Sequence, residues 1–147
     1  MSQYSASVPN DGQVKPAIHA FFERFYKISD TPDGHENYAN QFTSYGKLIM
    51  GSNEVNGRDG IIKMRHAMWE KVAKRSHKPA QLYSFGSGSD DIMLFGTVDY
   101  TLKDGKGTTV DWAARAHFVG DSDDLKMDFY QVYLVGIGRE DFVNGNR

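Results

Sequence analysis

Residues 91–119 read DIMLFGTVDYTLKDGKGTTVDWAARAHFV, in which two strand-like runs flank a loop that contains glycine. The pattern predicts a β-hairpin, because β-branched and aromatic residues favour strands and glycine favours turns. A three-residue loop at 104–106, which pairs Thr101 with Thr109, gives the hairpin one apolar face. That face consists of Ile92, Leu94, Gly96, Val98, Tyr100, Val110, Trp112, Ala114, Ala116 and Phe118. The small residues among them predict room for a pocket beside Trp112.

Helices are predicted ahead of this hairpin, and the apolar face should meet them. The segment KPAIHAFFERFYKI at 15–28 spaces its apolar residues at helical intervals, and Pro16 is tolerated in a first turn. A shorter helix is predicted after the turn residues at 30–34, with Tyr38 and Phe42 on one side. The core-facing residues of the first helix are Ile18, Phe21, Phe22 and Phe25.

The segment IIKMRHAMWEKV at 61–72 predicts a third helix, in which Arg65 lies in the middle of the apolar stripe. An isolated buried guanidinium is costly, so Arg65 requires a partner. That partner is a ligand carboxylate or polarised carbonyl, or an internal acid, unless the side chain reaches solvent at the helix edge. Basic residues are expected to cap this helix before Pro79, which cannot continue it. They are Lys71, Lys74, Arg75, His77 and Lys78.

Three further strands are predicted, at 47–51 (KLIMG), 80–85 (AQLYSF) and 125–136 (LKMDFYQVYLVG). The residues at 52–60 are interpreted as a turn that leads into the third helix. Strict alternation in the last strand predicts a set of inward-facing residues. They are Leu125, Met127, Phe129, Gln131 and Tyr133.

The chain of 147 residues has the size and composition of one globular domain, with 39% hydrophobic and 24% charged residues. We expect a flexible tail at 1–13, the domain at 14–136 and a second tail at 137–147. A formal net charge of -2 gives no basis for binding nucleic acid or an anionic membrane. The lack of cysteine excludes disulfides and thiolate chemistry. Because no segment resembles a signal peptide or a membrane span, a cytoplasmic protein is expected.

The order of these segments resembles the nuclear transport factor 2-like superfamily, and within it the SnoaL-like proteins, including fungal proteins of this type. The resemblance rests on the phenylalanine-rich first helix, NYANQFTSYGKLIMG at 37–51, NGRDGIIKMRHAMW at 56–69 and the strands WAARAHF and FYQVYL. It implies an α+β cone, in which three N-terminal helices pack in a strongly bent mixed or antiparallel sheet. It also implies a mostly apolar pocket and a dimer formed through the outer face of the sheet.

The catalytic residues of the superfamily do not carry over to this chain. Steroid-isomerase-like members use an aspartate on the first strand, where this chain has Ile49. SnoaL-type cyclases use an aspartate late in the last strand, where Gln131 is the nearest polar residue. The histidine pair of scytalone-dehydratase-like members has no identified counterpart. Asp99, Asp111 and Arg115 match the residue types of an epoxide-hydrolase-like relay, but the hairpin register places them outside the pocket.

The candidate ligand-binding residues are polar or aromatic groups that are predicted to face the pocket. Gln131 is prominent, because a buried amide needs partners that a ligand or an ordered water supplies. The aromatic residues could form the wall of the pocket or belong to the core. The full set is Arg65, Trp69, Trp112, Phe129, Gln131, Tyr133, Tyr26 and Tyr38.

A second group, formed by Asp99, Asp111, Arg115 and His117, is predicted on the outer face of the hairpin. These residues could activate a water molecule. Cross-strand ion pairs at a homodimer contact explain them more simply. The histidines show no HxxxH spacing, so no metal site is predicted, and no cofactor is expected.

Two interpretations of the function remain open. The first is a cofactor-free isomerase, cyclase or dehydratase of secondary or degradative metabolism, which moves protons on an apolar oxygenated metabolite. The second is a non-catalytic ligand-binding or dimerisation module. The lack of an aspartate or histidine predicted to face the pocket favours the second interpretation, whereas the inward polar groups favour the first. Epoxide-hydrolase-like activation of water is a further alternative.

Overall fold

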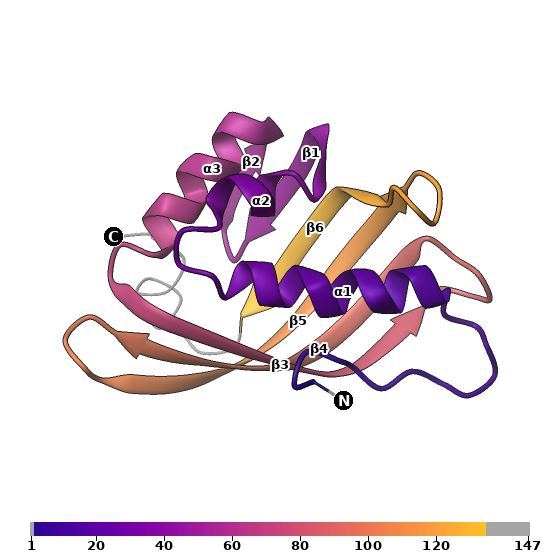
Figure 1. The fold of residues 1–147 in the computed structure, drawn as a ribbon, viewed down its shortest axis with the longest axis horizontal. Coiled ribbons are helices and arrows are strands. Elements are labelled where there is room, and N and C mark those ends of the chain that lie inside the picture. The colour runs from indigo at the N-terminus through magenta and orange to yellow at the C-terminus, as the bar shows by residue number, and fades with distance from the viewer. Residues whose placement is uncertain (1, 135–147) are drawn as a thin grey trace.

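The computed structural model describes residues 2–134, which form three helices and one six-stranded sheet (Figure 1). The described elements are α1 (Pro16–Ser29), α2 (His35–Ala39), β1 (Phe42–Met50), β2 (Asn53–Asn56), α3 (Gly57–Met68), β3 (Val72–Ser84), β4 (Asp91–Leu102), β5 (Gly107–Val119) and β6 (Lys126–Leu134). The predicted C-terminal tail at 137–147 lies outside the described residues, as do the last two residues of the predicted domain.

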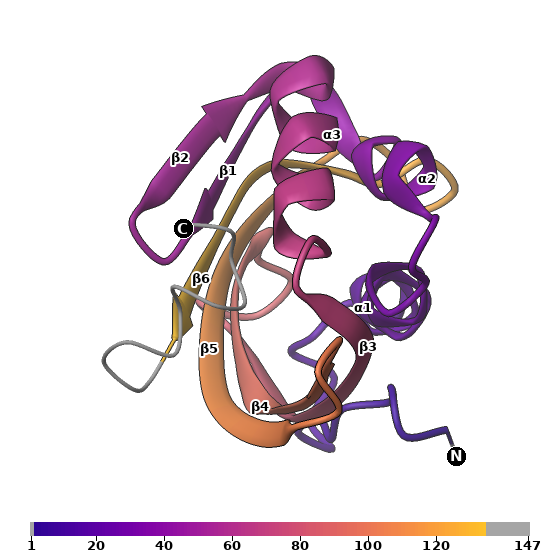
Figure 2. The same cartoon turned by 90° about the vertical axis from the view of Figure 1, so that its left-hand side faces the viewer.

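The sheet is mixed, with the strand order β2-β1-β6-β5-β4-β3. Strands β1 and β6 run parallel, and all other neighbouring strands run antiparallel. The sheet bends strongly, so that α1 lies along its concave side and α3 packs beside β1 (Figure 2). The predicted α+β class, with three helices inside a bent mixed sheet, is confirmed.

The faces of the β4–β5 hairpin are as predicted, but its register is not. Thr101 pairs with Gly107 instead of Thr109, and the Leu102 amide donates to the carbonyl oxygen of Lys106. The loop therefore lies one residue earlier than predicted, and the pairing moves by two positions along one strand. A shift by an even number leaves every side chain on its predicted face.

Helix α1 forms where the phenylalanine pattern predicts it, and its apolar face is buried in the concave side of the sheet. Phe21 and Phe22 contact the ring of Phe118 edge-on, with centroid distances of 4.9 and 5.4 Å. Tyr38 and Phe42 lie 5.6 Å apart by ring centroids, as the short second helix predicts, although Phe42 already belongs to β1. Aromatic packing of this kind anchors the helix on the sheet.

The predicted third helix is too long at its C-terminal end. Helix α3 ends at Met68, and Val72 begins strand β3. The predicted basic cap is therefore wrong, because four of its five residues lie on a strand and do not follow a helix. Pro79 lies inside β3, which tolerates it because β3 is an edge strand. The segment predicted as a turn at 52–60 contains the short strand β2 and the start of α3.

A β-bulge at Asp128 overturns the predicted orientation of β6. Met127 pairs with Phe118, but the next pair joins Phe129 to His117, so Asp128 is an extra residue in β6. The alternation therefore changes phase after Met127. Tyr130 and Val132 are buried, whereas Phe129, Gln131 and Tyr133 face outward.

The segment predicted as a flexible tail at 1–13 pairs with the sheet near Ser7. Ser7 forms a parallel bridge with Gln81 at the free edge of β3, and Ala6 is buried. The Ser7 amide donates to the Ala80 carbonyl, and the Leu82 amide donates to the Ser7 carbonyl. An edge strand offers such unpaired backbone groups, and the N-terminal segment satisfies them.

Gly96 provides a test of the close approach between β3 and β4. A Cβ atom at Gly96 would overlap the carbonyl oxygen of Lys78 and lie 2.8 Å from the Cα atom of Pro79. We expect Gly96→Ala to lower the free energy of unfolding by about 2–3 kcal/mol, because β3 would have to move. Urea unfolding measures the change. Gly107→Ala is the control, since its Cβ would meet the Tyr100 carbonyl oxygen at an ordinary 3.7 Å; equal losses in the two variants would contradict the argument.

Candidate functional site

Arg65 is buried, and no acidic side chain within residues 2–134 pairs with it. Its guanidinium donates from Nη1 to the carbonyl oxygen of Ser29 at 2.8 Å and from Nη2 to that of Thr31 at 3.0 Å. Its Nε donates to Nδ1 of His35 at 3.2 Å. The predicted requirement for a partner is met by two backbone carbonyls and a histidine, so neither an internal acid nor a ligand is needed. Because Ser29 ends α1, Arg65 also lies at the negative end of that helix.

The surroundings of Arg65 keep it charged and its partner neutral. The guanidinium lies 4.5 Å from the ring centroid of Tyr38 and 5.6 Å from that of Trp69, within the range of cation–π attraction. Burial lowers the pKa of Arg65, but a guanidinium remains protonated at neutral pH. Burial first, and then the charge of Arg65, lower the pKa of His35, so that its Nδ1 is free to accept. Arg65 is therefore a structural residue.

A small internal cavity lies between the end of α1 and the concave face of the sheet. Its volume is about 20 Å³, roughly the space of one water molecule. Its lining combines thioether, aromatic, imidazole and guanidinium groups. The residues are Ser29, Tyr38, Met50, Met68, Arg75, His77, Val98, Tyr100, Trp112, Tyr130, Val132 and Leu134. The pocket predicted beside Trp112 is therefore present but small, since Gly96 leaves room for the backbone of β3 and not for a ligand.

A buried pair of titratable side chains borders this cavity. Nδ1 of His77 lies 2.5 Å from Oδ1 of Asp30, and the His77 backbone amide donates to Oδ2 of Asp30 at 2.8 Å. The two side chains are 12% and 6% exposed, respectively. A carboxylate that accepts from Nδ1 holds the proton there, so that a neutral imidazole keeps its lone pair on Nε2. No hydrogen-bond partner for Nε2 is found among residues 2–134.

Tyrosine hydroxyls surround the same space. Tyr26 and Tyr130 share a buried hydrogen bond of 2.7 Å. Burial raises the pKa of both hydroxyls well above the ordinary value, and it raises the pKa of Tyr38 to about 12. The pKa of Tyr100 is raised by burial, while the nearby charge of Arg75 acts in the opposite sense. These hydroxyls therefore stay protonated at neutral pH and can donate.

Trp112 places an indole N–H donor in the buried interior. Its Nε1 is buried and lacks a hydrogen-bond partner among the described residues. The indole ring packs against Tyr26 at 5.1 Å and against His77 at 5.8 Å, by ring centroids. A buried donor without a partner is rare in folded proteins and is often satisfied by a water or a ligand. An oxygen atom in the cavity would meet this need.

The structure divides the predicted ligand-binding residues into three groups. Trp112 and Tyr38 line the cavity, and Tyr26 packs against the Trp112 ring. Arg65 and Trp69 pack outside its lining. Phe129, Gln131 and Tyr133 lie on the outer face, where Gln131 accepts from the Tyr133 hydroxyl at 3.1 Å and Phe129 stacks under Arg115. Gln131 therefore does not face inward, contrary to the prediction from strict alternation.

The sequence interpretation missed Asp30 and His77, which are the residues best able to act as an acid and a base. Asp30 looked like a turn residue and His77 like part of a helix cap. A strand that starts at Val72 would have been the signal, because alternation with one bulge turns Arg75 and His77 inward. The lining also includes Tyr130, which a bulge at Asp128 turns inward.

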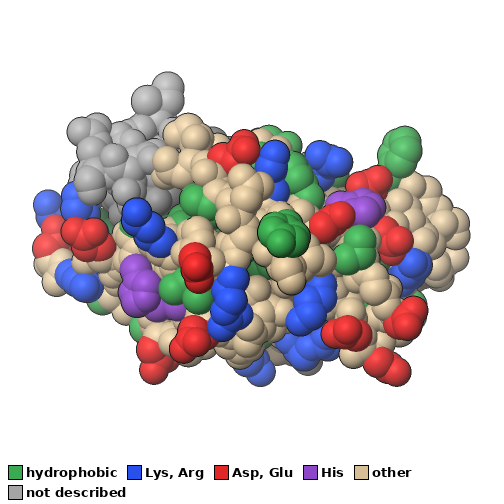
Figure 3. All heavy atoms as spheres, turned by 90° about the horizontal axis from the view of Figure 1, so that it is seen from above, with side chains coloured by type: hydrophobic (Ala, Val, Ile, Leu, Met, Phe, Trp, Pro, Cys, Tyr) green, Lys and Arg blue, Asp and Glu red, His purple; other side chains and the backbone are tan. Residues whose placement is uncertain are grey.

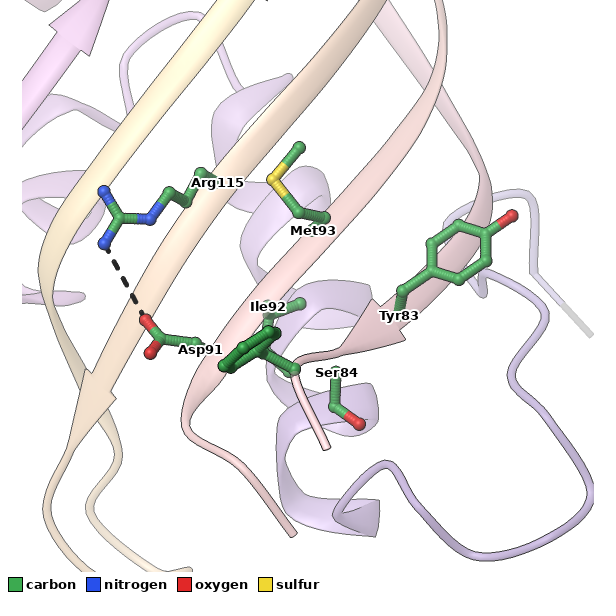
Figure 4. A pocket seen from close by; sticks show the side chains of 7 residues that line it. Tyr83, Ser84, Asp91, Ile92, Met93 and Arg115 are labelled. Atoms are coloured by element: carbon green, nitrogen blue, oxygen red, sulfur yellow. Dashed lines mark ion pairs between the residues drawn. The ribbon is translucent and has the colours of Figure 1, made fainter. Parts of the chain in front are cut away.

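A second hollow lies on the outer face of the sheet, with a volume of about 360 Å³. Figure 4 shows Arg115, Met93 and Tyr83 on the same side of the sheet, with Arg115 directed toward Asp91. The side chains are largely apolar and partly exposed. The lining residues are Tyr83, Ser84, Phe85, Asp91, Ile92, Met93 and Arg115.

Other classes of site find little support in the part of the chain that the structure describes. No three histidine, aspartate or glutamate residues within 2–134 come together as metal ligands. In the view of Figure 3, basic and acidic side chains alternate over the surface without a large region of one sign. None of the described helices is both long and apolar enough to cross a membrane.

Solved structures share this fold. Nuclear transport factor 2 of Cryptosporidium parvum superposes with a TM-score of 0.68 at 11% identity, over 88% of this chain and all (100%) of that chain. A proposed scytalone dehydratase of Novosphingobium aromaticivorans gives 0.71 at 14% identity, over 82% and 83% of the two chains. A proposed SnoaL-like polyketide cyclase of Shewanella denitrificans gives 0.66 at 10% identity, over 82% and 92%. No family model and no curated protein matches the sequence.

Replacement of Arg65 tests its structural role. Arg65→Met would leave the buried carbonyls of Ser29 and Thr31 without donors, so we expect the free energy of unfolding to fall by about 3 kcal/mol or more. Arg58→Met, in the same helix, removes an exposed pair with Glu36 and should cost less than about 1 kcal/mol. Chemical denaturation of both variants measures the difference. A stable Arg65→Met protein would mean that these carbonyls find other donors.

The buried tyrosines predict loss of stability at alkaline pH. Unfolded tyrosines ionise near pH 10, whereas the raised pKa values of Tyr26, Tyr38 and Tyr130 keep their protons on the folded chain. Their contribution is complete below about pH 10 and is lost as the pH rises through the folded-state values. We expect the free energy of unfolding to fall above about pH 10, with a shallower fall in Tyr26→Phe. Denaturation at several pH values measures this, and Tyr45→Phe, at an exposed site, should follow the wild type.

Proposed function

Since the chain has the fold of the nuclear transport factor 2-like superfamily, we propose that it is a cofactor-free enzyme that transfers a proton within an apolar oxygenated metabolite. The observation that carries this proposal is the Asp30–His77 pair, held at 2.5 Å beside an internal cavity. A histidine oriented by a carboxylate is a common general base, because its lone pair is fixed in direction and its proton affinity suits neutral pH.

The groups around the pair support a simple sequence of proton transfers. Nε2 of His77 removes a proton from a carbon next to a carbonyl group. Negative charge then develops on the carbonyl oxygen, where the Trp112 indole N–H and a tyrosine hydroxyl can donate. The imidazolium returns its proton either to another carbon, which gives an isomer, or to a departing hydroxyl group, which releases water. Isomerase and dehydratase chemistry are thus variants of one arrangement.

The small cavity limits how a substrate can bind. A volume of about 20 Å³ holds one water, so a substrate must displace that water and move part of the lining. Met50 and Met68 are suited to this movement, because unbranched thioether side chains adopt many conformations. The lining is mainly aromatic and apolar, which favours a compact ring or a short carbon skeleton with one or two oxygen atoms.

The same small volume favours a second candidate function, a non-catalytic module that acts through its surface. An epoxide-hydrolase-like relay gains no support, because Asp99, Asp111 and Arg115 face away from the cavity. Asp99 is also engaged by Thr109 and Lys78, which lower its pKa through hydrogen bonds. The two candidates differ in one respect that can be measured: only the enzyme needs His77.

Hydrogen exchange tests the enzyme directly. Ketones and hydroxyketones with one or two rings are first screened for a rise in melting temperature, which ligand binding produces by mass action. For each that binds, proton NMR in deuterium oxide follows loss of the signal next to the carbonyl. We expect His77→Gln to lower the exchange rate by about 100-fold or more, with Asp30→Asn also impaired.

His117→Gln is the matched control for this experiment. His117 pairs with Asp128 through the same atoms, Nδ1 and Oδ1, at 2.7 Å, but on the outer face of the sheet. The His117→Gln variant should exchange the substrate hydrogen next to the carbonyl at the wild-type rate. Equal exchange in His77→Gln and the wild type would exclude His77 as the base, and binding without any exchange would favour the non-catalytic module.

We also propose that two copies associate through the outer face of the sheet. Three of the four residues predicted to make this contact pair within their own chain: Asp99 with Lys78, Arg115 with Asp91 at 3.9 Å, and His117 with Asp128. The exposed apolar residues of β3, β4 and β6 are better suited to bury area against a second copy. They are Tyr83, Met93, Phe95 and Tyr133. The hollow of Figure 4 lies on this surface, so a second copy could fill it.

A charge on this surface tests the association. Light scattering of the wild type should give twice the mass of 16.5 kDa. Met93→Glu places a carboxylate at the centre of the contact, and we expect it to give a single chain, since a buried unpaired charge is costly. Tyr45→Glu, at an exposed site on β1, should not change the mass. A wild type that scatters as one chain would refute the proposed dimer.

A further inference from the structure

A hollow of about 380 Å³, which we call the histidine hollow, lies where the end of α3 meets the start of α2, the start of β3 and the β4–β5 loop. Helix α2 lies beside α3 (Figure 2). The volume is within the range of small-molecule sites. Among the described residues, the hollow shares no lining residue with the internal cavity. Its polar lining residues are His35, His66, Glu70 and Lys103.

Arg65 determines which nitrogen of His35 carries the proton. Its Nε donates to Nδ1 of His35 at 3.2 Å, and a ring nitrogen can accept only with a free lone pair. A neutral His35 therefore carries its proton on Nε2. Burial first, and then Arg65 and His66, lower the pKa of His35, and the opposing effect of Asp33 is smaller. The ring is accordingly neutral at neutral pH.

The Nε2–H group of His35 is a donor that a ligand can reach. Nε2 has no hydrogen-bond partner among residues 2–134, and it is not one of their buried polar atoms. Donation from the Arg65 guanidinium to Nδ1 polarises the ring and strengthens Nε2–H as a donor. A metal ion would have to displace this proton. The arrangement therefore favours an acceptor with negative charge over a cation.

Lys103 adds a positive charge to the same hollow. Its backbone amide donates to the Lys71 carbonyl oxygen at 2.9 Å, which holds the loop against the start of β3. No ion pair engages its ammonium group within residues 2–134, and its flexible stem lets that group reach an anion in the hollow. Glu70 is the only acid among the described lining residues, and it is exposed. Lys103 and the Arg65 charge behind His35 outweigh it.

The rest of the lining suits a carbon skeleton. Pro32, Trp69 and Ala73 present apolar atoms to the hollow. The imidazole of His66 lies 4.3 Å from that of His35, by ring centroids, and adds a second flat surface. A molecule with one anionic group and a small ring or a short chain matches this combination.

We propose that the histidine hollow binds a small organic carboxylate. One carboxylate oxygen accepts from Nε2 of His35, the ammonium of Lys103 pairs with the charge, and the carbon skeleton packs against Pro32, Ala73 and the His66 ring. The charged and hydrogen-bonded partners explain the polar end of the ligand, and the apolar lining explains the other. This site is separate from the Asp30–His77 pair, so it stands whether or not the chain is an enzyme.

Titration of the full chain with benzoate, followed by long-range ¹H–¹⁵N NMR of the histidine rings, tests the proposal. In the free protein we expect the His35 proton on Nε2. Benzoate should shift the His35 and His66 signals, with half-saturation below about 10 mM for a ligand of this size. Benzamide, which has the same shape without the charge, should bind at least about 10-fold more weakly. Inorganic phosphate, which lacks the carbon skeleton, should also bind more weakly.

Several results of this titration would overturn the proposal. They are a His35 proton on Nδ1, the absence of saturable shifts with benzoate, and binding of benzamide or phosphate as tight as that of benzoate. Shifts at His77 without shifts at His35 would place benzoate in the internal cavity and would also overturn it.

Two variants test the assigned contacts. His35→Asn keeps an oxygen that can accept from Arg65 and removes Nε2–H, so we expect benzoate affinity to fall by about 10-fold. Lys103→Met should lower the affinity by about 3-fold to 5-fold. Lys106→Met, in the same loop but outside the lining, should bind as the wild type does. If the melting temperature shows that His35→Asn is unfolded, Lys103→Met decides, and unchanged affinity in that variant would refute the site.

Discussion

The C-terminal end of α1 is held by hydrogen bonds from two other elements, and the arrangement of the cone depends on this point. Arg65 of α3 donates to the carbonyls of Ser29 and Thr31, while Asp30 accepts from the backbone and the ring of His77 in β3. The last carbonyls of a helix lack partners within the helix, and they attract cations. The guanidinium is therefore satisfied by backbone atoms, and α1, α3 and β3 are fixed relative to one another.

The same point creates the polar region inside an otherwise apolar core. Because backbone carbonyls accept the hydrogen bonds of Arg65, the Asp30 carboxylate is available to His77. The imidazole of His77 borders the cavity. Tyrosine hydroxyls from α1, α2, β4 and β6 surround it, each kept protonated by burial. Buried polar groups persist only when their hydrogen bonds are made. Within residues 2–134 the Nε1 of Trp112 has no hydrogen-bond partner, and this feature most favours an oxygen atom of a ligand or water at this place.

Much of the fold could be predicted from local patterns. The phenylalanine spacing placed α1, and the apolar face of the β4–β5 hairpin was correct although its loop was misplaced by one residue. Such predictions succeed because a periodic pattern is repeated over ten or so residues, and an even shift of register does not alter it. The candidate site was predicted less well. Trp112 and Tyr38 do line the cavity, and their role as ligand-binding residues stays a prediction, whereas Asp30 and His77 were not considered as a pair.

The sequence by itself determined the three helices, the faces of the β4–β5 hairpin and the place of Arg65 on the apolar stripe of α3. Tertiary structure alone decided what Arg65 contacts, which residues of β6 face inward and which acid meets His77. The physical reason is that each of these outcomes depends on a single local irregularity or on a contact between residues distant in sequence, neither of which a periodic pattern encodes. One bulge at Asp128 reverses the face of every residue that follows it in the strand, and contacts between residues distant in sequence arise only when the sheet bends around α1.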